Sequence, residues 1–399
     1  MRRRILVVAE AVTLAHLGRP LALAKILEQL GHEVVFACTP AASRWLAMEA
    51  RAYEPVWSIS SEDFKRSLAR GAPPYDRATL LRYVEDDLDI IDRVRPDVII
   101  GDFRLSLYVS ARLRKRPYGA VANAYWSPRY FEIAQVPDIP LVRWLGAPVA
   151  DVAFRATYRA AFRWHARSFL DVCAHFGVAA PGRTLLEVYT SSDCTAFADA
   201  EEFYAPRGAR EVREAFIGPL EWSPSIPLPP GHEQWGRDRP LVYVSLGSSG
   251  SPRVAQRVLD ALADAPVDVV ASTAGARLER APPGVVTLDY APGEILCRRA
   301  ALVIGNGGSP VAYQALQAAA PLLGLASNLD QFLNMRMIER IGAGRCVRAS
   351  HARVRDIRRE TLELIDHAPE RDAALRGSRV VATYHGPTRI DTWLAALAG

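Results

Sequence analysis

Hydrophobic residues occur along this chain in short continuous runs, and longer amphipathic segments separate these runs. The first run, Ile5 to Ala9, is typical of a buried strand, and Glu33 to Cys38 predicts a second one. Between them, Pro20 to Leu30 predicts a helix that has proline in its first turn and ends at Gly31. The chain is therefore expected to open with a strand, a loop, a helix and a second strand.

The same alternation continues through the first half of the chain. Further strands are predicted at Asp97 to Gly101, near 118–123 and near Cys194 to Ala198, and helices at 105–114 and 141–176. Strands that alternate with helices form parallel sheets, because each helix carries the chain back to the start of the next strand. The pattern predicts an α/β fold with a parallel, doubly wound sheet.

The segment 219–240 interrupts this pattern, because it holds six prolines and no apolar periodicity, and we interpret it as an interdomain linker. A second alternating series follows, with strands predicted at 241–246, 267–271, 285–288, 302–305 and 322–325, and helices at 252–264, 310–319, 354–366, 369–383 and 387–397. We therefore expect two Rossmann-like domains in tandem, at 1–218 and 241–380.

Composition and charge narrow the class of protein. A length of 399 residues suits two domains, and 50% hydrophobic with 23% charged residues is typical of a globular chain. The net charge of +5 is spread thinly, and we find no lysine-rich or aromatic-interleaved stripe of the kind that follows a nucleic acid, which disfavours nucleic acid as a partner. The acidic run 85–89 lies in an amphipathic helical segment, so we interpret it as a solvated helix face and not as a metal site.

Cysteine usage and the apolar runs bear on the compartment. The five cysteines are scattered without a Cys-x-x-Cys pair, which indicates neither disulfides nor zinc and fits a reducing cytoplasm. The apolar run after Met1 ends at Glu10, too early for a signal peptide. No run approaches the ~18 apolar residues of a spanning helix, which leaves only peripheral contact with a membrane open.

The segment Gly305-Asn306-Gly307-Gly308-Ser309-Pro310 is the strongest candidate for chemistry, since it joins a predicted strand to a predicted helix. Glycines allow backbone amides to approach a ligand, and the positive end of a helix dipole favours phosphate. Gln314, Asp330 and Gln331 follow near the carboxyl ends of the neighbouring strands, where open α/β sheets bind ligands. The pattern favours a site for a diphosphate, a ribose and a polyhydroxyl group.

The string GNGGSPVAYQALQAAAPLLGLASNLDQFLN resembles the donor-binding signature of the GT-B nucleotide-sugar glycosyltransferases, which include UDP-glycosyltransferases and macrolide glycosyltransferases. The resemblance implies two Rossmann-like domains that face a central cleft, and a tail at 381–399 that packs back on the first domain. It implies a UDP- or dTDP-linked sugar as co-substrate, with no metal and no other cofactor. By position it places Gly307, Gly308 and Ser309 on the diphosphate, Gln314 on the ribose, Asp330 and Gln331 on the sugar, Tyr290 or Ala291 against the base, and Ser245, Gly247 and Ser248 beside the phosphates. Asn306 stands where the family usually has histidine.

In the first domain the family places a catalytic histidine in the loop after the first strand, and His16 occupies this position with one extra residue before Pro20. A neutral imidazole can take a proton from a hydroxyl, and a neighbouring carboxylate fixes its tautomer. Asp102, at the end of the strand that begins at Asp97, is the matching carboxylate. His16 and Asp102 are thus the predicted general base and its partner.

The acceptor is expected to contact Arg19 and the segment after the strand near 118–123, which contributes Asn123, Tyr125 and Trp126. Aromatic walls suit an apolar acceptor that carries a hydroxyl group. A solvated position for Arg19, and packing of the aromatic residues against helix 141–176, are the alternatives.

Together these features predict an inverting, metal-independent glycosyltransferase that acts on a lipophilic acceptor. A non-catalytic relative that serves as the partner of another transferase is the alternative, and a sugar-nucleotide epimerase is a second one. A nicotinamide oxidoreductase is disfavoured, because no Gly-x-Gly-x-x-Gly follows the first strand.

Overall fold

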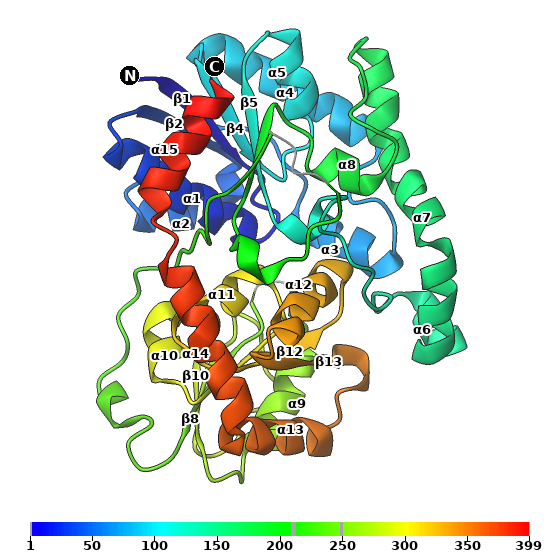
Figure 1. The fold of residues 1–399 in the computed structure, drawn as a ribbon. Coiled ribbons are helices and arrows are strands. Elements are labelled where there is room, and N and C mark those ends of the chain that lie inside the picture. Colours follow the sequence, from blue (N-terminus) through cyan, green and yellow to red (C-terminus); the bar gives the residue numbers. More distant parts are fainter. Residues whose placement is uncertain (1, 209–212, 248–249, 399) are drawn as a thin grey trace. The chain divides into compact units, whose positions relative to one another are not determined.

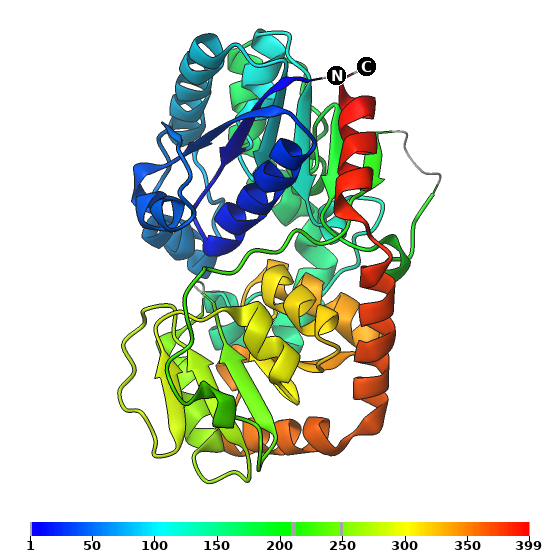
Figure 2. The same ribbon diagram turned by 90° about the vertical axis from the view of Figure 1, so that its left-hand side faces the viewer.

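The computed structural model describes residues 2–208, 213–247 and 250–398. The chain divides into two compact units (Figures 1 and 2). Unit 1 comprises Met1–Ile133, Ile139–Trp222 and Tyr384–Gly399, and unit 2 comprises Ala134–Asp138 and Ser223–Thr383. Both are α/β units with parallel sheets, as the alternating pattern predicted.

Unit 1 contains a seven-stranded sheet in the order β3-β2-β1-β4-β5-β6-β7. Its strands are β1 (Arg4–Ala9), β2 (Glu33–Cys38), β3 (Glu54–Pro55), β4 (Val98–Asp102), β5 (Tyr118–Ala122), β6 (Cys194–Phe197) and β7 (Glu214–Phe216). Its helices are α1 (Leu14–Gln29), α2 (Ser43–Met48), α3 (Ser61–Arg70), α4 (Arg77–Val94), α5 (Leu107–Leu113), α6 (Pro140–Leu145), α7 (Ala147–His175), α8 (Leu185–Tyr189) and α15 (Gly386–Leu397). Sequence reasoning missed β3 and β7, which are two and three residues long and carry no apolar run.

The first helix begins earlier than the sequence predicts. Proline favours a first turn, but α1 starts at Leu14 and contains Pro20 in its interior. His16 and Arg19 therefore lie on helical turns and not in a loop. Pro20 has no N–H to donate to the carbonyl of His16, so the first turns of α1 depend more on contacts from outside the helix.

Unit 2 contains a six-stranded sheet in the order β10-β9-β8-β11-β12-β13. Its strands are β8 (Leu241–Ser245), β9 (Asp268–Ser272), β10 (Val285–Leu288), β11 (Leu302–Gly305), β12 (Leu322–Ala326) and β13 (Gly344–Arg348). Its helices are α9 (Pro252–Leu262), α10 (Gly293–Arg299), α11 (Ser309–Gln317), α12 (Leu329–Arg340), α13 (Val354–Asp366) and α14 (Ala368–Ala382). The edge strand β13 was missed, because arginine and cysteine interrupt its apolar pattern.

Two segments join a unit that is distant from them in sequence. The last helix, α15, packs on α1 and β6 of unit 1, where the Trp393 indole donates to the carbonyl of Cys194 at 3.1 Å. Ala134–Asp138 belongs to unit 2, where the backbone N–H of Asp138 donates to the carbonyl of Ser327 at 2.7 Å. The Asp138 carboxylate also pairs with Arg348 at 2.8 Å. No pattern in the sequence predicted that Ala134–Asp138 belongs to unit 2.

Candidate active site

A histidine and a buried aspartate lie together at the carboxyl end of the sheet in unit 1. The strands β1 and β4 are neighbours, and their last residues, Ala9 and Asp102, are paired in register. The chain therefore enters α1 beside Asp102, and His16 Nδ1 lies 2.8 Å from Asp102 Oδ1. Asp102 is buried, whereas 19% of the His16 side chain is exposed. With the proton on Nδ1, the ring donates to the carboxylate and keeps Nε2 as a proton acceptor.

Arg19, one helical turn after His16, holds the same carboxylate. Its Nη2 donates to Asp102 Oδ1 at 2.9 Å, and its Nε forms an ion pair with Oδ2 at 2.8 Å. Its Nη1 donates to the Asn123 side-chain oxygen at 2.6 Å, and Asn123 in turn donates to Asp199 at 3.1 Å. Arg19 and Asn123 are both buried. The two predicted acceptor contacts are thus arranged around the aspartate, and Asp199 and this network were missed by sequence reasoning.

A series of aromatic rings begins at His16. Phe103 adopts a positive φ of 60° and stacks on the imidazole, with ring centroids 4.7 Å apart. Tyr189 lies 5.0 Å from Phe103, and Trp126 lies 4.9 Å from Tyr189. These three residues are partly exposed, whereas the predicted contact Tyr125 is buried. The sequence pointed to Trp126 but not to Phe103 or Tyr189.

Buried charges lie beside Phe103, and they correct the interpretation of the acidic run at one residue, Asp87, while Glu85 and Asp89 are exposed as predicted. Asp87 on α4 is fully buried, and its Oδ1 lies 2.9 Å from Arg104 Nη2. Arg104 Nη1 lies 3.0 Å from Oε2 of Glu10, and both residues are also fully buried. Burial raises the pKa of Asp87 to about 6, although Arg104 opposes the shift. The error arose because the sequence does not show the arginine that neutralises Asp87 from the next strand end.

In unit 2 the glycine-rich turn connects β11 to α11, as predicted. The Asn306 side-chain oxygen accepts a hydrogen bond from the Gly308 N–H at 2.9 Å, which holds the turn. Gly307 has a φ of 79°, and a Cβ there would lie 2.6 Å from Met335 Cγ. Gly247, which follows β8, lies close to Asn306, since a Cβ added at Gly247 would be 3.4 Å from Asn306 Nδ2. The turn and the loop after β8 are therefore adjacent; Ser248 lies outside the described residues.

Four predicted donor residues lie on α11 or in the turn before α10. Ser309, the first residue of the helix, is buried. The Gln314 amide lies against Gly293, whose Cβ would be 2.6 Å from Gln314 Oε1, and its nitrogen donates to Ser223 at 3.0 Å. Gly293 directly follows the Tyr290-Ala291-Pro292 turn, so Gln314 lies next to that turn. The Tyr290 hydroxyl donates to the carbonyl of Ala274 at 3.0 Å, and Ala291 is buried.

The last two predicted residues open α12 and differ in their surroundings. Asp330 is partly exposed in the first helical turn. The Gln331 side chain is 2% exposed, and its oxygen accepts hydrogen bonds from the backbone N–H groups of Ser327 and Asn328 at 2.8 and 3.3 Å. Gln331 and Asn328 thus form a capping box. Its oxygen is used to fix the helix start, which the sequence alone did not indicate.

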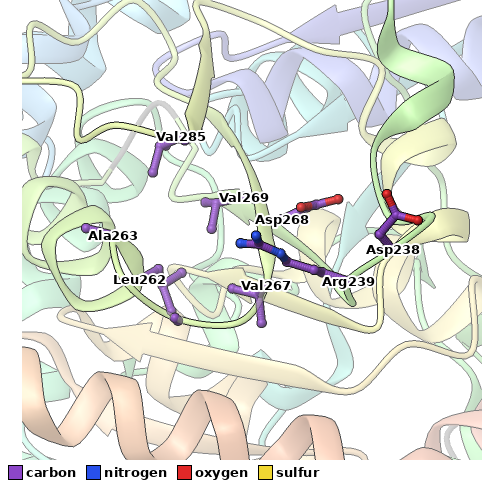
Figure 3. Close-up of a pocket in the computed structure, with 10 residues that line it drawn as sticks. Asp238, Arg239, Leu262, Ala263, Val267, Asp268, Val269 and Val285 are labelled. Atoms are coloured by element: carbon purple, nitrogen blue, oxygen red, sulfur yellow. The ribbon is translucent and has the colours of Figure 1, made fainter.

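Two cavities lie at opposite ends of the strands β9 and β10. The larger, of about 310 Å³, is lined by Asp268 and Val285 at the amino ends of these strands and by Leu262 at the end of α9 (Figure 3). The second, of about 240 Å³, includes Thr273 and Asp289 at the carboxyl ends. Asp289 precedes Tyr290, so the second cavity is the one beside the predicted base site.

The described residues contain neither a metal-binding group nor a membrane-spanning helix. Within 2–208, 213–247 and 250–398, no group of three or more histidine, cysteine, aspartate and glutamate side chains could hold a metal ion. No helix in these ranges is long and apolar enough to cross a membrane.

Two parallel α/β units, one of which carries a glycine-rich turn at a helix N-terminus, define a nucleotide-binding class of protein. Residues 256–397 match the family model "Erythromycin biosynthesis protein CIII-like, C-terminal domain". The solved structure of the Streptomyces sp. SF2575 glycosyltransferase SsfS6, complexed with thymidine diphosphate, is similar with a TM-score of 0.71 and 15% identity over 99% of both chains.

Curated relatives are similar over more of the sequence. A PGL/p-HBAD biosynthesis glycosyltransferase of Mycobacterium tuberculosis is 38% identical over 94% of this chain and 88% of its own. A PGL/p-HBAD biosynthesis rhamnosyltransferase of Mycobacterium bovis is 39% identical over 94% of this chain and 83% of its own. A further M. bovis relative, named an inactive PGL/p-HBAD biosynthesis glycosyltransferase, is 36% identical over 65% of this chain and 71% of its own. The chain therefore belongs to the GT-B nucleotide-sugar glycosyltransferases of the macrolide and natural-product type, as its donor motif predicted.

Proposed function

We propose that this glycosyltransferase transfers a hexose or 6-deoxyhexose, with inversion and without a metal ion, from a thymidine-diphosphate sugar to the hydroxyl of a lipophilic acceptor that bears an aromatic ring. The observation that carries the proposal is the pair formed by His16 and the buried Asp102, with Nδ1 and Oδ1 2.8 Å apart. A carboxylate on one ring nitrogen leaves the other to act as a base.

In the proposed mechanism, His16 Nε2 removes the proton from the acceptor hydroxyl as its oxygen attacks the anomeric carbon. Asp102 stabilises the resulting imidazolium, and Arg19 keeps the carboxylate in place. The bond from the anomeric carbon to the diphosphate breaks, and the leaving charge lies at the N-terminus of α11. Gly307 and Gly308 let the backbone approach the phosphates there, and the helix dipole stabilises them.

The choice of thymidine diphosphate rests on the similar SsfS6 complex. The choice of a 6-deoxyhexose as one sugar class rests on the M. bovis rhamnosyltransferase. The cavity of about 240 Å³ beside Tyr290 offers space for a pyrimidine. Asp330, which is partly exposed at the start of α12, is the proposed contact for the sugar hydroxyls.

The acceptor class rests on the rings beside the base. Phe103, Tyr189 and Trp126 form a partly exposed aromatic series that starts at the His16 ring. Aromatic side chains stack on ring-bearing ligands and bury apolar surface. We assign the acceptor contact to this series, in place of the buried Arg19, Asn123 and Tyr125.

The test uses dTDP-rhamnose as donor and a long-chain 4-alkylphenol as acceptor, with dTDP release and the product mass as readouts. We expect His16→Ala to lower kcat by about 10²- to 10⁴-fold, as loss of a general base does. Its thermal stabilisation by dTDP should equal that of the unchanged protein, since His16 lies in unit 1. His175→Ala, at the end of α7, is the matched control and should retain activity.

Each other outcome is informative. Unchanged turnover in His16→Ala would overturn the mechanism. Stabilisation by UDP but not by dTDP would overturn the choice of nucleotide. Binding of dTDP without turnover of any donor and acceptor would favour a non-catalytic role, which the relative named inactive keeps as the second candidate.

A further inference from the structure

An unusual share of exposed apolar side chains is concentrated on two consecutive helices of unit 1. Among the residues that the structure describes, ten large hydrophobic side chains are exposed, and six of them lie on α6 and α7. These six are Leu141, Trp144, Leu145, Val149, Val152 and Trp164. Trp144 is 83% exposed and Val152 is 69% exposed. Large exposed apolar groups in one place mark an interaction surface, whereas single ones need no explanation.

The packing of α7 shows which part of it serves the fold. The residues of α7 that are buried among large side chains, such as Phe162, Phe169 and Val172, lie in its C-terminal half. In the N-terminal half only Ala150 is buried. Figure 1 shows α8 beside the upper, C-terminal part of α7, whereas the N-terminal part of α7 follows directly on α6. The exposed apolar side chains thus lie mainly on the portion of the helix pair that contributes least to the core.

A row of arginines continues this surface along α7. Arg155, Arg159, Arg163 and Arg167 recur every four residues and are all exposed. Residues four apart are neighbours on a helix surface, and like charges in this arrangement destabilise the helix. The only carboxylates in α7 are Asp151 and Asp171. A row that costs helix stability is best explained by a polyanionic partner outside the chain.

We propose that α6 and α7 form a peripheral docking surface for a bilayer that contains anionic lipids. Tryptophan and aliphatic side chains insert at the level of the headgroups, as in interfacial helices, and arginines contact the lipid phosphates. The arginine stems can also lie on apolar surface while their charges stay in water. A second copy of the chain would meet the arginine row with like charge, which favours the lipid surface.

The proposal does not rest on the transfer reaction, and the two can fail separately. Co-sedimentation of the full chain is measured with vesicles of phosphatidylcholine, with or without phosphatidylglycerol as one third of the lipid. We expect binding to the anionic vesicles only, and loss of this binding in high salt because exposed charges are screened. No binding to anionic vesicles would overturn the proposal.

Two double variants test the two halves of the surface. Trp144→Ala with Val152→Ser should abolish vesicle binding, and Arg155→Gln with Arg159→Gln should weaken it about 25-fold, from about fivefold per arginine. All four side chains are exposed, so the melting temperature should not change. Leu375→Ser on α14 and Arg355→Gln on α13, both exposed, are the controls and should bind normally.

Two further measurements distinguish lipid binding from an effect on the transfer reaction and from self-association of the chain. Turnover of a water-soluble phenol should be the same in all variants, since none of the substituted residues is among the proposed base, acceptor or donor residues. A change of oligomeric state in the α6 and α7 variants, measured by light scattering, without an effect on vesicle binding would assign this surface to a second copy and overturn the lipid proposal.

Discussion

At the scale of single residues, the proposed base His16 is paired with a carboxylate that has little freedom to move. Asp102 is held on both oxygens by Arg19 and also contacts His16. A carboxylate fixed in this way orients the imidazole through a single geometry. Arg19 itself is fixed by Asn123, which bonds to Asp199. From these contacts we infer that Arg19 positions Asp102, whereas the sequence assigned Arg19 to the acceptor.

Replacing Arg19 tests this role. Lysine keeps the charge but cannot make the fork of contacts to Asp102 and Asn123, so Arg19→Lys should lower kcat and leave the donor KM unchanged. Arg19→Met leaves the buried Asp102 without its cation and should lower the free energy of unfolding by about 3–5 kcal/mol. Steady-state kinetics and urea unfolding measure the two effects.

The exposed Arg66 on α3 provides the control, because its pairs with Glu62 and Asp63 are largely solvated. Arg66→Lys should change neither kcat nor stability measurably. An Arg19→Lys enzyme with unchanged kcat and an increased KM for the acceptor would instead restore the earlier assignment of Arg19 to the acceptor.

At residue scale, the sequence predicted the local backbone where a motif carries its own geometry, but it did not show the contacts that depend on neighbouring elements. Asn306, Gly307 and Ser309 lie in the expected turn because glycine at a strand end restricts the possible backbone paths. Gln331 was assigned to the sugar from its position alone, yet its oxygen caps α12. Which of two roles a glutamine takes depends on neighbours that only the fold brings together.

At the scale of elements, the conformation of the glycine-rich turn between β11 and α11 depends on Gly307 more than on its other glycines. Gly307 combines a φ of 79° with a close approach of Met335, whose Cγ would lie 2.6 Å from a Cβ at this position. Gly307→Ala should therefore remove the stabilisation by dTDP and lower the melting temperature. Backbone strain in the left-handed region costs on the order of 1–3 kcal/mol before any clash is counted. Thermal unfolding with and without dTDP measures both effects.

Gly284 separates strain from steric clash, since it has the same φ of 79° but nothing within 4 Å of the position of a Cβ. Gly284→Ala should lower the melting temperature slightly and keep the full response to dTDP. Equal loss of the response in both variants would show that the turn is not specifically involved in donor binding.

The buried charges between α4 and the ends of β1 and β4 give unit 1 a pH-dependent stability. The pKa of Asp87 is about 6 in the fold, against an ordinary value of 3.8, because burial disfavours the carboxylate. Between these values the folded protein binds more protons than the unfolded chain. The contribution of Asp87 to stability is therefore full below about pH 4 and is lost as the pH rises to about 6.

Comparison of the unchanged protein with Asp87→Asn isolates this effect. The difference between their free energies of unfolding should vary by on the order of 1–3 kcal/mol from pH 4 to pH 6, since one unit of pKa corresponds to about 1.4 kcal/mol. Asp89→Asn, on the exposed face of the same helix, should show no such variation. A constant difference for Asp87→Asn across this range would mean that Asp87 is ionised throughout.

Most elements were predictable because an apolar run or an amphipathic period fixes them locally, as in β1, β11 and α15. The exceptions have a physical cause in the rest of the fold. Asp102, which lies outside α1, pairs with His16 and Arg19 on its first turns, so the helix extends before Pro20. The strand β13 is polar because it is an edge strand, and its register comes from its pairing with β12.

At the scale of the whole molecule, the chain enters unit 2 and returns to unit 1 at its C-terminal end. Residues 384–399 belong to unit 1, whose core includes Trp393 with 1% exposure. A Cβ at Gly119 on β5 would lie 2.6 Å from the Trp393 ring, so the indole fills the space that this glycine leaves. The last helix is therefore part of unit 1 and not of unit 2, which precedes it in the sequence.

This connection predicts a separation of effects between the two units. Trp393→Ala should lower the free energy of unfolding of unit 1 by about 3–5 kcal/mol, because it leaves a cavity and removes the hydrogen bond to Cys194. The affinity for dTDP, whose proposed site lies in unit 2, should be unchanged when measured by calorimetry below the unfolding temperature. Leu375→Ala, on the exposed face of α14 in unit 2, should alter neither quantity. If Trp393→Ala weakened dTDP binding instead, α15 would couple the two units, and the C-terminal helix would be part of the donor site as well as of the fold.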